Sequence, residues 1–226
     1  MKAGNQTYLD LADLPTSLAL FPLTGALLLP AGNMPLNIFE PRYLSMLEDA
    51  IAGHRIIGMV QPRFDLADGE QSEDHPQLCE VGCMGRITAH QESGDGRVMI
   101  NLSGVARFRI REETKLVNGY RTAKVAGFAD DLSEDPEAAK AVDRDGLLRT
   151  FKQFLEANDM EADWDGVREA NTETLVNTLS MMSPYGPAEK QALLEAPDLK
   201  TRSETLVAIT EIMLAREAGT SSSTLQ

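Results

Sequence analysis

Cysteine is scarce in this chain, with only Cys79 and Cys83 among 226 residues. Two cysteines do not build the disulfide framework of a small secreted domain, and no second pair is present to complete a tetrahedral zinc site. If their segment is a strand, the two side chains point to the same face about 13 Å apart, which is too far for a disulfide. We therefore expect two reduced thiols.

Long apolar runs are also missing. The longest apolar stretch, residues 18–31, is interrupted by Pro22, Gly25 and Pro30, and it is shorter than the roughly 20 residues that a membrane helix needs. The first residues lack the charged-then-apolar order of a signal peptide. These absences predict a cytoplasmic protein with no membrane partner.

Sequence signatures of common enzymes are absent as well. The chain contains no GxxxxGK[ST] or GxGxxG phosphate loop, no GxSxG nucleophile turn and no HExxH helix. Its three histidines, His54, His75 and His90, stand in no recognisable catalytic pattern, and adjacent carboxylates such as Glu48 and Asp49 are typical of a solvated surface. We predict no catalytic residue, no metal site, no cofactor and no enzymatic activity.

Basic residues are fewer than acidic ones: the chain has 21 Lys and Arg and 35 Asp and Glu, for a net charge of −14. Such a surface repels phosphate backbones, so we predict no nucleic-acid partner. The imbalance is uneven, because residues 1–129 carry 12 basic and 15 acidic side chains whereas residues 130–226 carry 9 and 20. This difference indicates two regions of different construction.

The first region has the pattern of a compact sheet or barrel, with short β-type runs separated by Gly, Pro and Asp. Strands are predicted over 18–23, 26–29, 34–39, 55–61, 80–91, 97–102, 105–112 and 120–127. The turn residues at 93–96 predict a hairpin. A helix is predicted over 41–53, with Tyr43, Leu44, Leu47 and Ile51 inward, and residues 63–77 read as a long exposed loop.

Beyond residue 130 the periodicity becomes helical. Asp135 and Pro136 suit the start of a first helix; a second is predicted over 165–182 with Met182 on its buried face, and a third over 188–195. Thr201 and Glu204 have the spacing of a capping box for a last helix. The predicted domains are a barrel over 1–129, a helical bundle over 130–218 and a disordered tail over 219–226.

Arginines alternate at Arg107, Arg109 and Arg111, so that all three share one face if the segment is a strand. The acidic helical region of the same chain is the predicted partner, because neutralisation within the chain needs no second molecule.

Three motifs together resemble the Lon substrate-binding (LON N-terminal) domain family. The first is LFPLTGALLLPAGNMPLNIFEPRY at 20–43, the second is EVGCMGRI at 80–87, and the third is LSGVARF at 102–108, similar to the family's G-x-x-R strand. PAEKQALLE at 187–195 adds to them, and the resemblance covers residues 18–216.

The resemblance implies an α+β fold: an N-terminal β-rich, PUA-like pseudo-barrel with one short helix, followed by a C-terminal α-helical bundle. It also implies recognition of polypeptides. The ATPase and Ser–Lys peptidase of full-length Lon proteases have no counterpart here, so a stand-alone member is expected.

Five residues are candidates for peptide binding. Gln61, Arg63 and Phe64 place polar, charged and aromatic groups where a strand enters the exposed loop. Arg42 and Tyr43 lie where a strand turns into a helix, and an architectural role explains them with fewer assumptions than a binding role.

The leading hypothesis is a non-catalytic module that binds exposed segments of unfolded or client polypeptides. It would use an apolar groove or a free strand edge, and it would work with a separate ATP-dependent protease or as a homo-oligomer. One alternative is a PUA-like small-ligand or RNA-binding protein, against which the net charge argues. The other is a hydrolase that uses Cys83 or a serine with a histidine.

Overall fold

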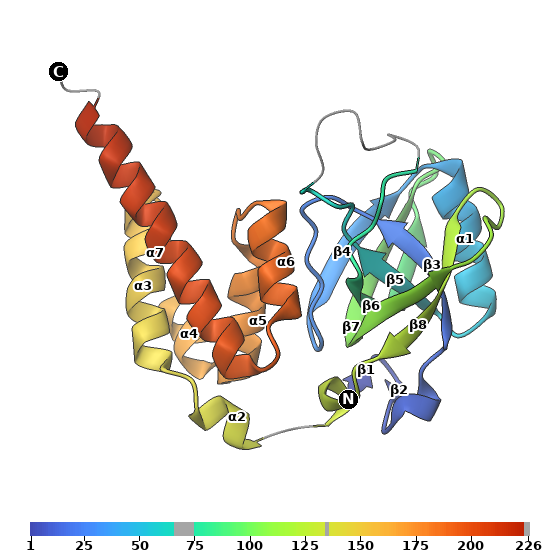
Figure 1. Cartoon of the computed structure of the whole chain (residues 1–226), viewed down its shortest axis with the longest axis horizontal. Helices are drawn as coiled ribbons and strands as arrows, with labels where there is room; N and C mark the ends of the chain where they lie inside the picture. Colours follow the sequence, from blue (N-terminus) through green and yellow to red (C-terminus); the bar gives the residue numbers. More distant parts are fainter. Residues whose placement is uncertain (66–74, 134–135, 224–226) are drawn as a thin grey trace. The chain divides into compact units, whose positions relative to one another are not determined.

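The computed structural model describes residues 1–65, 75–133 and 136–223 (Figure 1). The strands are β1 (Lys2–Ala3), β2 (Gln6–Thr7), β3 (Ser17–Pro22), β4 (Asn33–Ile38), β5 (Ile56–Val60), β6 (Val81–Glu92), β7 (Val98–Glu113) and β8 (Arg121–Gly127). The helices are α1 (Pro41–Ala52), α2 (Pro136–Lys140), α3 (Arg144–Ala157), α4 (Trp164–Glu169), α5 (Thr172–Met182), α6 (Pro187–Glu195) and α7 (Leu199–Ser223). Short 3₁₀ turns occupy Leu11–Asp13 (η1) and Ala129–Leu132 (η2).

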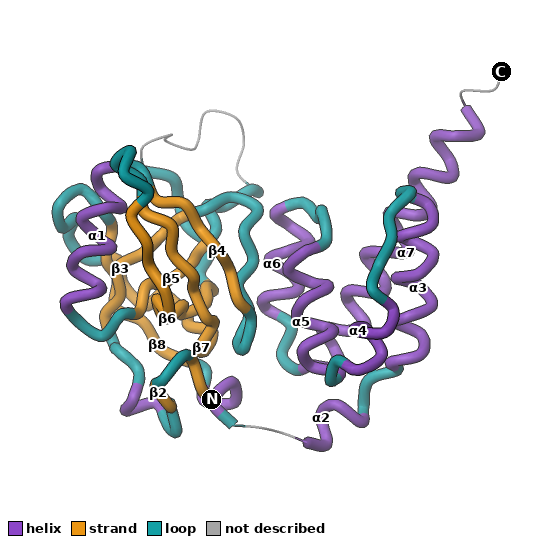
Figure 2. Tube along the Cα trace, turned by 180° about the vertical axis from the view of Figure 1, so that it is seen from behind, coloured by secondary structure: helices purple, strands orange, loops and turns teal. Residues whose placement is uncertain are grey.

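The main sheet has the strand order β4-β7-β6-β5-β3-β8, and β7 also pairs with β8. That extra pairing closes β7, β6, β5, β3 and β8 into a barrel, while β4 pairs with the first half of β7 outside the ring. All pairings are antiparallel except β3 with β5. Strands and most helices lie in separate parts of the chain (Figure 2). The predicted α+β fold, a β-rich pseudo-barrel followed by helices, is confirmed.

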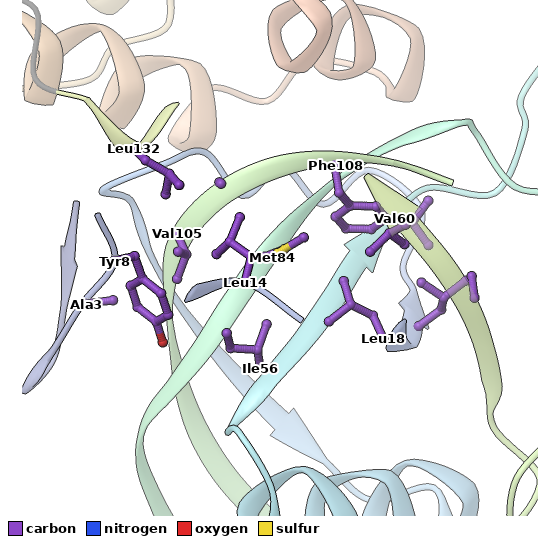
Figure 3. Packing of buried hydrophobic residues seen from close by; sticks show 14 residues of the cluster. Ala3, Tyr8, Leu14, Leu18, Ile56, Val60, Met84, Val105, Phe108 and Leu132 are labelled. Atoms are coloured by element: carbon purple, nitrogen blue, oxygen red, sulfur yellow. The ribbon is translucent and has the colours of Figure 1, made fainter. Parts of the chain in front are cut away.

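A cluster of apolar side chains packs inside the barrel. Phe108 of β7 and Met84 of β6 lie at its centre with no exposed surface, and Tyr8 and Leu132 close the end nearest β1 (Figure 3). Alternate residues of each strand point to one face, so the strand pattern in the sequence places these side chains inside.

Most of the predicted β elements are present, with two corrections. Residues 26–29 do not form a strand; Leu27, Leu28 and Leu29 are buried in a loop instead. The runs 97–102 and 105–112 form one strand, β7, with a bulge between them. The hairpin at 93–96 is confirmed by the bond from the Ser93 amide to the Arg97 carbonyl.

The helix at 41–53 is confirmed as α1, but its buried face is rotated from the prediction. Met46 and Ala50 are buried with Tyr43 and Leu47, whereas Leu44 and Ile51 are half-buried. The helix packs beside strand β3, and its buried residues 43, 46, 47 and 50 have the three- and four-residue spacing of one helical face. Of the predicted loop at 63–77, residues 66–74 lie outside the described residues.

The chain divides into two compact units: Met1–Glu134 with Pro184–Leu194, and Asp135–Ser183 with Glu195–Gln226. Helix α6 thus belongs with the barrel, although helices precede and follow it in the sequence. The Gln61 side chain donates to the Pro187 carbonyl (3.0 Å) and to Gln191 Oε1 (3.1 Å). Gln191 in turn donates to the Val81 carbonyl (3.1 Å), so buried amides fix α6 against β5 and β6.

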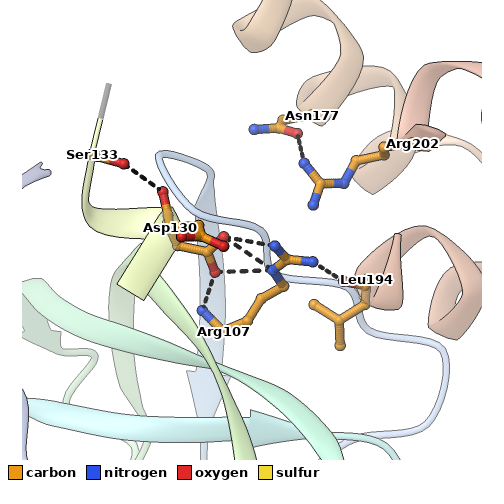
Figure 4. Close-up of polar contacts among 7 residues, drawn as sticks. Arg107, Asp130, Ser133, Asn177, Leu194 and Arg202 are labelled. Atoms are coloured by element: carbon orange, nitrogen blue, oxygen red, sulfur yellow. Dashed lines mark hydrogen bonds and ion pairs between the residues drawn. The ribbon is translucent and has the colours of Figure 1, made fainter. Parts of the chain in front are cut away.

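A buried ion pair also ties α6 to the barrel. The Arg107 guanidinium donates to both Asp131 oxygens, at 2.8 to 3.1 Å, and to the Leu194 carbonyl at 3.2 Å (Figure 4). The prediction that the 107–111 arginines pair with the acidic helical region is wrong for both residues whose ion pairs are seen. Arg107 pairs with Asp131 in η2, which belongs to the barrel unit, and Arg109 pairs with Glu80 of the barrel at 2.8 Å.

In the second unit, α7 packs against α2, α3 and α5. Leu147, Phe154, Leu175 and Leu206 supply buried apolar contacts. Inside this unit the Arg202 guanidinium donates to the Asn177 side chain at 3.2 Å, so a buried charge has a polar partner.

Three predictions about the helices need correction. The helix predicted over 165–182 is two helices, because the Asn171 side chain caps a new one, α5, by accepting from the Thr174 amide. Met182 is 79% exposed rather than buried. Asp198, not Thr201, caps α7, since its carboxylate accepts from the Thr201 amide at 2.7 Å.

Two further expectations concern segment ends. Helix α7 runs to Ser223, past residue 219 where the tail was predicted to begin. The predicted cap at Asp135 lies outside the described residues.

Candidate functional site

A small cavity of about 150 Å³ opens on the barrel unit where α1, the end of β3 and the β7–β8 turn meet. It is lined by Pro22, Arg42, Tyr43, Pro62, His75, Pro76, Gly119, Tyr120 and Arg121. Three prolines, two phenol rings and two guanidinium groups therefore share one concave surface.

The β7–β8 turn forms one wall because of its glycine. Val117 and Tyr120 exchange backbone hydrogen bonds of 2.9 Å around Asn118 and Gly119, whose φ angles are 47° and 85°. Asn-Gly is the preferred sequence for such a two-residue turn. A Cβ on Gly119 would lie 3.3 Å from the Arg42 Cβ, so glycine also allows the turn to pack close to α1.

Arg42 and Tyr43 form the opposite wall from the first turn of α1. The Arg42 guanidinium pairs with Glu40 at 2.8 Å and lies 4.7 Å from the centre of the Tyr43 ring. The Tyr43 ring packs edge-on against Phe21, with the two centroids 4.5 Å apart. Pro41 starts the helix, because its fixed φ suits the first helical position. The Arg42 guanidinium is therefore oriented both by the Glu40 carboxylate and by the Tyr43 ring.

Arg121 and Tyr120 complete the floor, and both have partners. Arg121 donates to both oxygens of Glu113 and, at 2.5 Å, to the Pro76 carbonyl. The Tyr120 hydroxyl donates to Asp49 at 2.7 Å. Burial and the Asp49 carboxylate raise the pKa of Tyr120 to about 12, and burial raises the pKa of Tyr43. Both phenols are hence neutral at physiological pH.

The cavity is suited to holding one side chain or a short stretch of backbone. Each guanidinium already faces a carboxylate, so the site has no large excess of positive charge. The guanidinium N–H groups of Arg42 and Arg121 donate to oxygen acceptors, as their bonds to Glu40 and Glu113 show. The prolines and phenol rings offer apolar contact. This combination fits a polypeptide segment better than a phosphate group.

Loss of the Tyr120 hydroxyl is expected to lower the free energy of unfolding by about 1–2 kcal/mol at neutral pH, since its bond to a carboxylate is removed. Because folding raises the pKa of this phenol, its contribution is complete below about pH 10 and is lost as the pH rises toward 12. Urea unfolding of Tyr120→Phe and the unaltered protein should therefore show curves that converge at alkaline pH. A constant difference across that range would contradict the assignment.

The predicted binding residues divide into three groups. Arg42 and Tyr43 line the cavity. Gln61 does not lie at a rim: only 2% of it is exposed, and its amide bonds to Gly25 and α6, so we remove it from the candidate set. Arg63 and Phe64 follow Pro62 along the chain; Arg63 pairs with Asp65 at 2.6 Å and Phe64 is 43% exposed. These two stay candidates.

His and Cys side chains are the possible metal ligands and catalytic groups in the sequence, and the structure gives the surroundings of several of them. Within residues 1–65, 75–133 and 136–223, no group of three or more His, Cys, Asp or Glu side chains could hold a metal ion. His54 Nδ1 accepts from the Ile56 amide at 3.2 Å, and burial lowers the pKa of this imidazole. Cys83 is buried in β6 and forms no disulfide, and its Sγ donates to the Met84 carbonyl at 3.7 Å.

Sequence reasoning missed His75, Tyr120 and Arg121 as members of the site. The Asn118-Gly119 pair between two strand-like runs is a strong hairpin signal and would have placed Tyr120 and Arg121 beside a tight turn. Nothing in the sequence shows that this turn packs against α1, because that contact joins segments far apart in the chain.

Comparison with known proteins identifies the fold. Residues 17–211 match the family described as the ATP-dependent protease La (LON) substrate-binding domain. The chain belongs to this family. Among curated relatives, the Lon protease of Flavobacterium johnsoniae is 27% identical over 198 residues, which is 86% of this chain and 24% of that protein. Lon protease 2 of Sorangium cellulosum is 26% identical over 202 residues, covering 85% of this chain and 24% of that protein.

Solved Lon domains agree with the family assignment. A Lon N-terminal domain protein from Xanthomonas campestris is 26% identical with a TM-score of 0.55, covering 86% of this chain and 98% of that one. The N-terminal domain of the Mycobacterium avium complex Lon protease shares the fold, with a TM-score of 0.64 at 18% identity over 86% of this chain and 98% of that one.

The match covers only part of each curated relative. The chain spans about a quarter of the length of the curated Lon proteases it matches. The similarity is to their substrate-binding domain and not to their ATPase or peptidase domains. In the described part of the chain, no helix has the length and apolar character needed to cross a membrane.

Proposed function

We propose that this chain is a non-catalytic polypeptide-recognition module whose barrel cavity receives part of an exposed segment of a client protein. The observation that carries the proposal is the cavity lined by Arg42 and Tyr43 in a chain of the Lon substrate-binding family. Its apolar prolines and its hydrogen-bond donors match the mixed chemistry of an unfolded chain. Because the curated relatives are Lon proteases, delivery of the bound segment to an ATP-dependent protease is the associated proposal.

In the proposed complex, Arg42 donates to a backbone carbonyl or an acidic side chain of the client. The Tyr43 ring and Pro22 contact an apolar group beside it. Phe64 and Arg63 extend the contact from the loop that begins at Pro62. Binding through one small cavity gives modest affinity, since the area buried is far below that of a stable protein interface.

The test is fluorescence anisotropy of a labelled, unfolded polypeptide titrated with the protein, with a folded protein as the negative probe. Arg42→Ala is expected to weaken binding about five- to ten-fold, the loss of one charge-assisted hydrogen bond. Arg109→Ala is the matched control, because Arg109 is also a half-exposed arginine paired with a glutamate, outside the cavity. Equal binding by both variants would remove the cavity from the proposal.

The alternative of RNA binding is addressed by a short RNA in the same assay. Phosphate contacts make binding fall steeply with salt, because bound counterions are released. We expect no RNA binding from a chain with a net charge of −14. Saturable, strongly salt-dependent RNA binding would replace the polypeptide proposal with the PUA-like alternative.

A further inference from the structure

A second cavity, in the helical unit, lies at the elbow between α3 and α4. It has a volume of about 360 Å³ and is lined by Lys152, Leu155, Glu156, Met160, Glu161, Ala162 and Trp164. Leu155 is buried, Trp164 is half-buried and Met160 is 43% exposed, so the cavity offers accessible apolar side chains beside its charged ones. A volume at the low end of ligand pockets suits one or two side chains rather than a large cofactor.

The end of α3 fixes one wall of this cavity. The Met160 amide donates to the Leu155 carbonyl at 2.9 Å, which is the six-to-one bond of a Schellman cap. Asp159, with φ of 51°, takes the left-handed position of that cap. Such a cap commonly brings the residue after it against the last buried residue of the helix, here Met160 against Leu155. The Asn158 side chain adds a bond to the Phe154 carbonyl at 2.9 Å.

The start of α4 fixes the other wall. The Asp163 carboxylate accepts from the amides of Asp165 (3.2 Å) and Gly166 (3.1 Å), so it caps the helix directly before Trp164. Capping bonds at both ends of a short connection leave its backbone little freedom. The cavity is therefore formed before any partner arrives.

The rim of the cavity is acidic, because Glu156 and Glu161 line it together with a single cation, Lys152. Residues 156–165, EANDMEADWD, contain five carboxylates and no lysine or arginine. Glu156 faces Lys152 at 3.7 Å across one turn of α3. For Asp159 and Glu161, no ion pair occurs among the residues that the structure describes. Apolar side chains in the cavity thus lie beside an acidic segment in which Glu156 pairs with Lys152 and Asp165 pairs with Arg168.

We propose that this cavity docks a cationic amphipathic segment of another protein, with one apolar side chain against Leu155, Met160 and Trp164 and flanking Lys or Arg residues against Glu156 and Glu161. Charge complementarity selects this occupant, because the acidic rim repels nucleic acids and anionic lipid surfaces. Met adapts to varied apolar side chains, and a Trp ring attracts a nearby cation as well as apolar groups. This site is separate from the barrel cavity and does not depend on the proposed function.

Trp164 makes the proposal directly measurable, since it is the only tryptophan in the chain. The probe is a synthetic peptide of alternating Leu and Lys residues, and the matched probe has Glu in place of every Lys. We expect the Lys peptide to produce a saturable change in Trp164 fluorescence that weakens at high salt. The Glu peptide is expected to leave the fluorescence unchanged.

Two variants test the two halves of the recognition. The double substitution Glu156→Gln with Glu161→Gln is expected to weaken the Lys peptide about ten-fold and to reduce the salt dependence, because two exposed ion pairs are lost. Met160→Ser is expected to weaken it by a similar factor through loss of apolar contact. The control, Glu173→Gln with Glu211→Gln, removes two exposed carboxylates outside the cavity and should bind normally.

Several outcomes would overturn the proposal: no fluorescence change with the Lys peptide, equal binding of the Glu peptide, or equal weakening by the control pair. A fluorescence change that follows protein concentration without peptide would assign the cavity to a second copy of this chain instead. Arg42→Ala leaves this site intact, so it should bind the Lys peptide normally whether or not the barrel cavity binds clients. Circular dichroism of each variant checks that the helices are retained.

Discussion

Methionine in place of Arg107 is expected to lower the free energy of unfolding by about 3–5 kcal/mol, the cost of leaving a buried charge without its partner. The side chains of Arg107 and Asp131 are only 3% and 8% exposed. Removing the guanidinium leaves the buried Asp131 carboxylate without its cation. The hydrogen bond from the Arg107 backbone amide to this carboxylate, at 2.7 Å, would remain. It also frees the Leu194 carbonyl and removes the cation over the Phe128 ring, 5.1 Å away.

Urea unfolding with matched variants separates pairing from packing. Arg109→Met removes an arginine that is 41% exposed and paired with Glu80, so it should cost no more than about 1 kcal/mol. The double variant Arg107→Met with Asp131→Leu should be more stable than Arg107→Met alone, because no unpaired charge is then buried. Hydrogen exchange should show that α6 loses protection first, since Arg107 bonds to its Leu194 carbonyl. If Arg107→Met is as mild as Arg109→Met, the ion pair does not hold this helix.

The sequence predicts strands β6 and β8 closely. Val81–Glu92 and Arg121–Gly127 match their predicted ranges to within one residue, because turn residues bound each strand-like run. The prediction fails at residues 26–29, where three leucines in a row suit a strand equally well. There the chain must pass close to Gly104 of β7, and a loop meets that requirement.

The candidate sites are only partly readable from the sequence. Arg42 and Tyr43 are singled out by the strand-to-helix turn that they start, and they do line the barrel cavity. Gln61 is also a polar residue at the end of a predicted strand. Its side-chain amide, however, is hydrogen-bonded to α6, which lies 126 to 130 positions later in the chain. Contacts of that range depend on packing. The cavity beside Trp164 is formed by the helix caps at Asp159 and Asp163, and no sequence motif marks it.

Alanine in place of Gly104 is expected to destabilise the protein by about 3 kcal/mol or more, the upper range for forcing extra atoms into a packed interior. A Cβ built on Gly104 would lie 2.0 Å from the Leu29 carbonyl oxygen and 2.8 Å from its carbon. Backbone atoms cannot rotate away as a side chain does, so the loop before β4 must move. The move breaks the bonds from the Ala31 amide to Gly104 (3.0 Å) and from the Gly104 amide to Gly32 (2.8 Å).

Ser103→Ala supplies the control on the same strand. It removes only the exposed bond from the Ser103 hydroxyl to Asn33 at 2.7 Å, so a loss of about 1 kcal/mol or less is expected. Urea unfolding compares the two variants, and hydrogen exchange should show that Gly104→Ala exposes the amides of β4. Equal free energies of unfolding for Gly104→Ala and Ser103→Ala would mean that the loop before β4 moves aside with little loss of stability.

The spacing of Gly104 and Arg107 follows from the bulge between them. Met84 pairs with Ala106 and Gly85 with Gly104, so Val105 is the extra residue in β7. A bulge turns the strand locally and re-aims the side chains on either side of it. Gly104 thereby packs against the backbone of residues 29–32 and bonds to it, while the Arg107 side chain bonds to η2 and α6. Because one strand serves both contacts, Gly104→Ala is expected to weaken the attachment of α6 as well as of β4. Protection of α6 unchanged in that variant would show that the two contacts act independently.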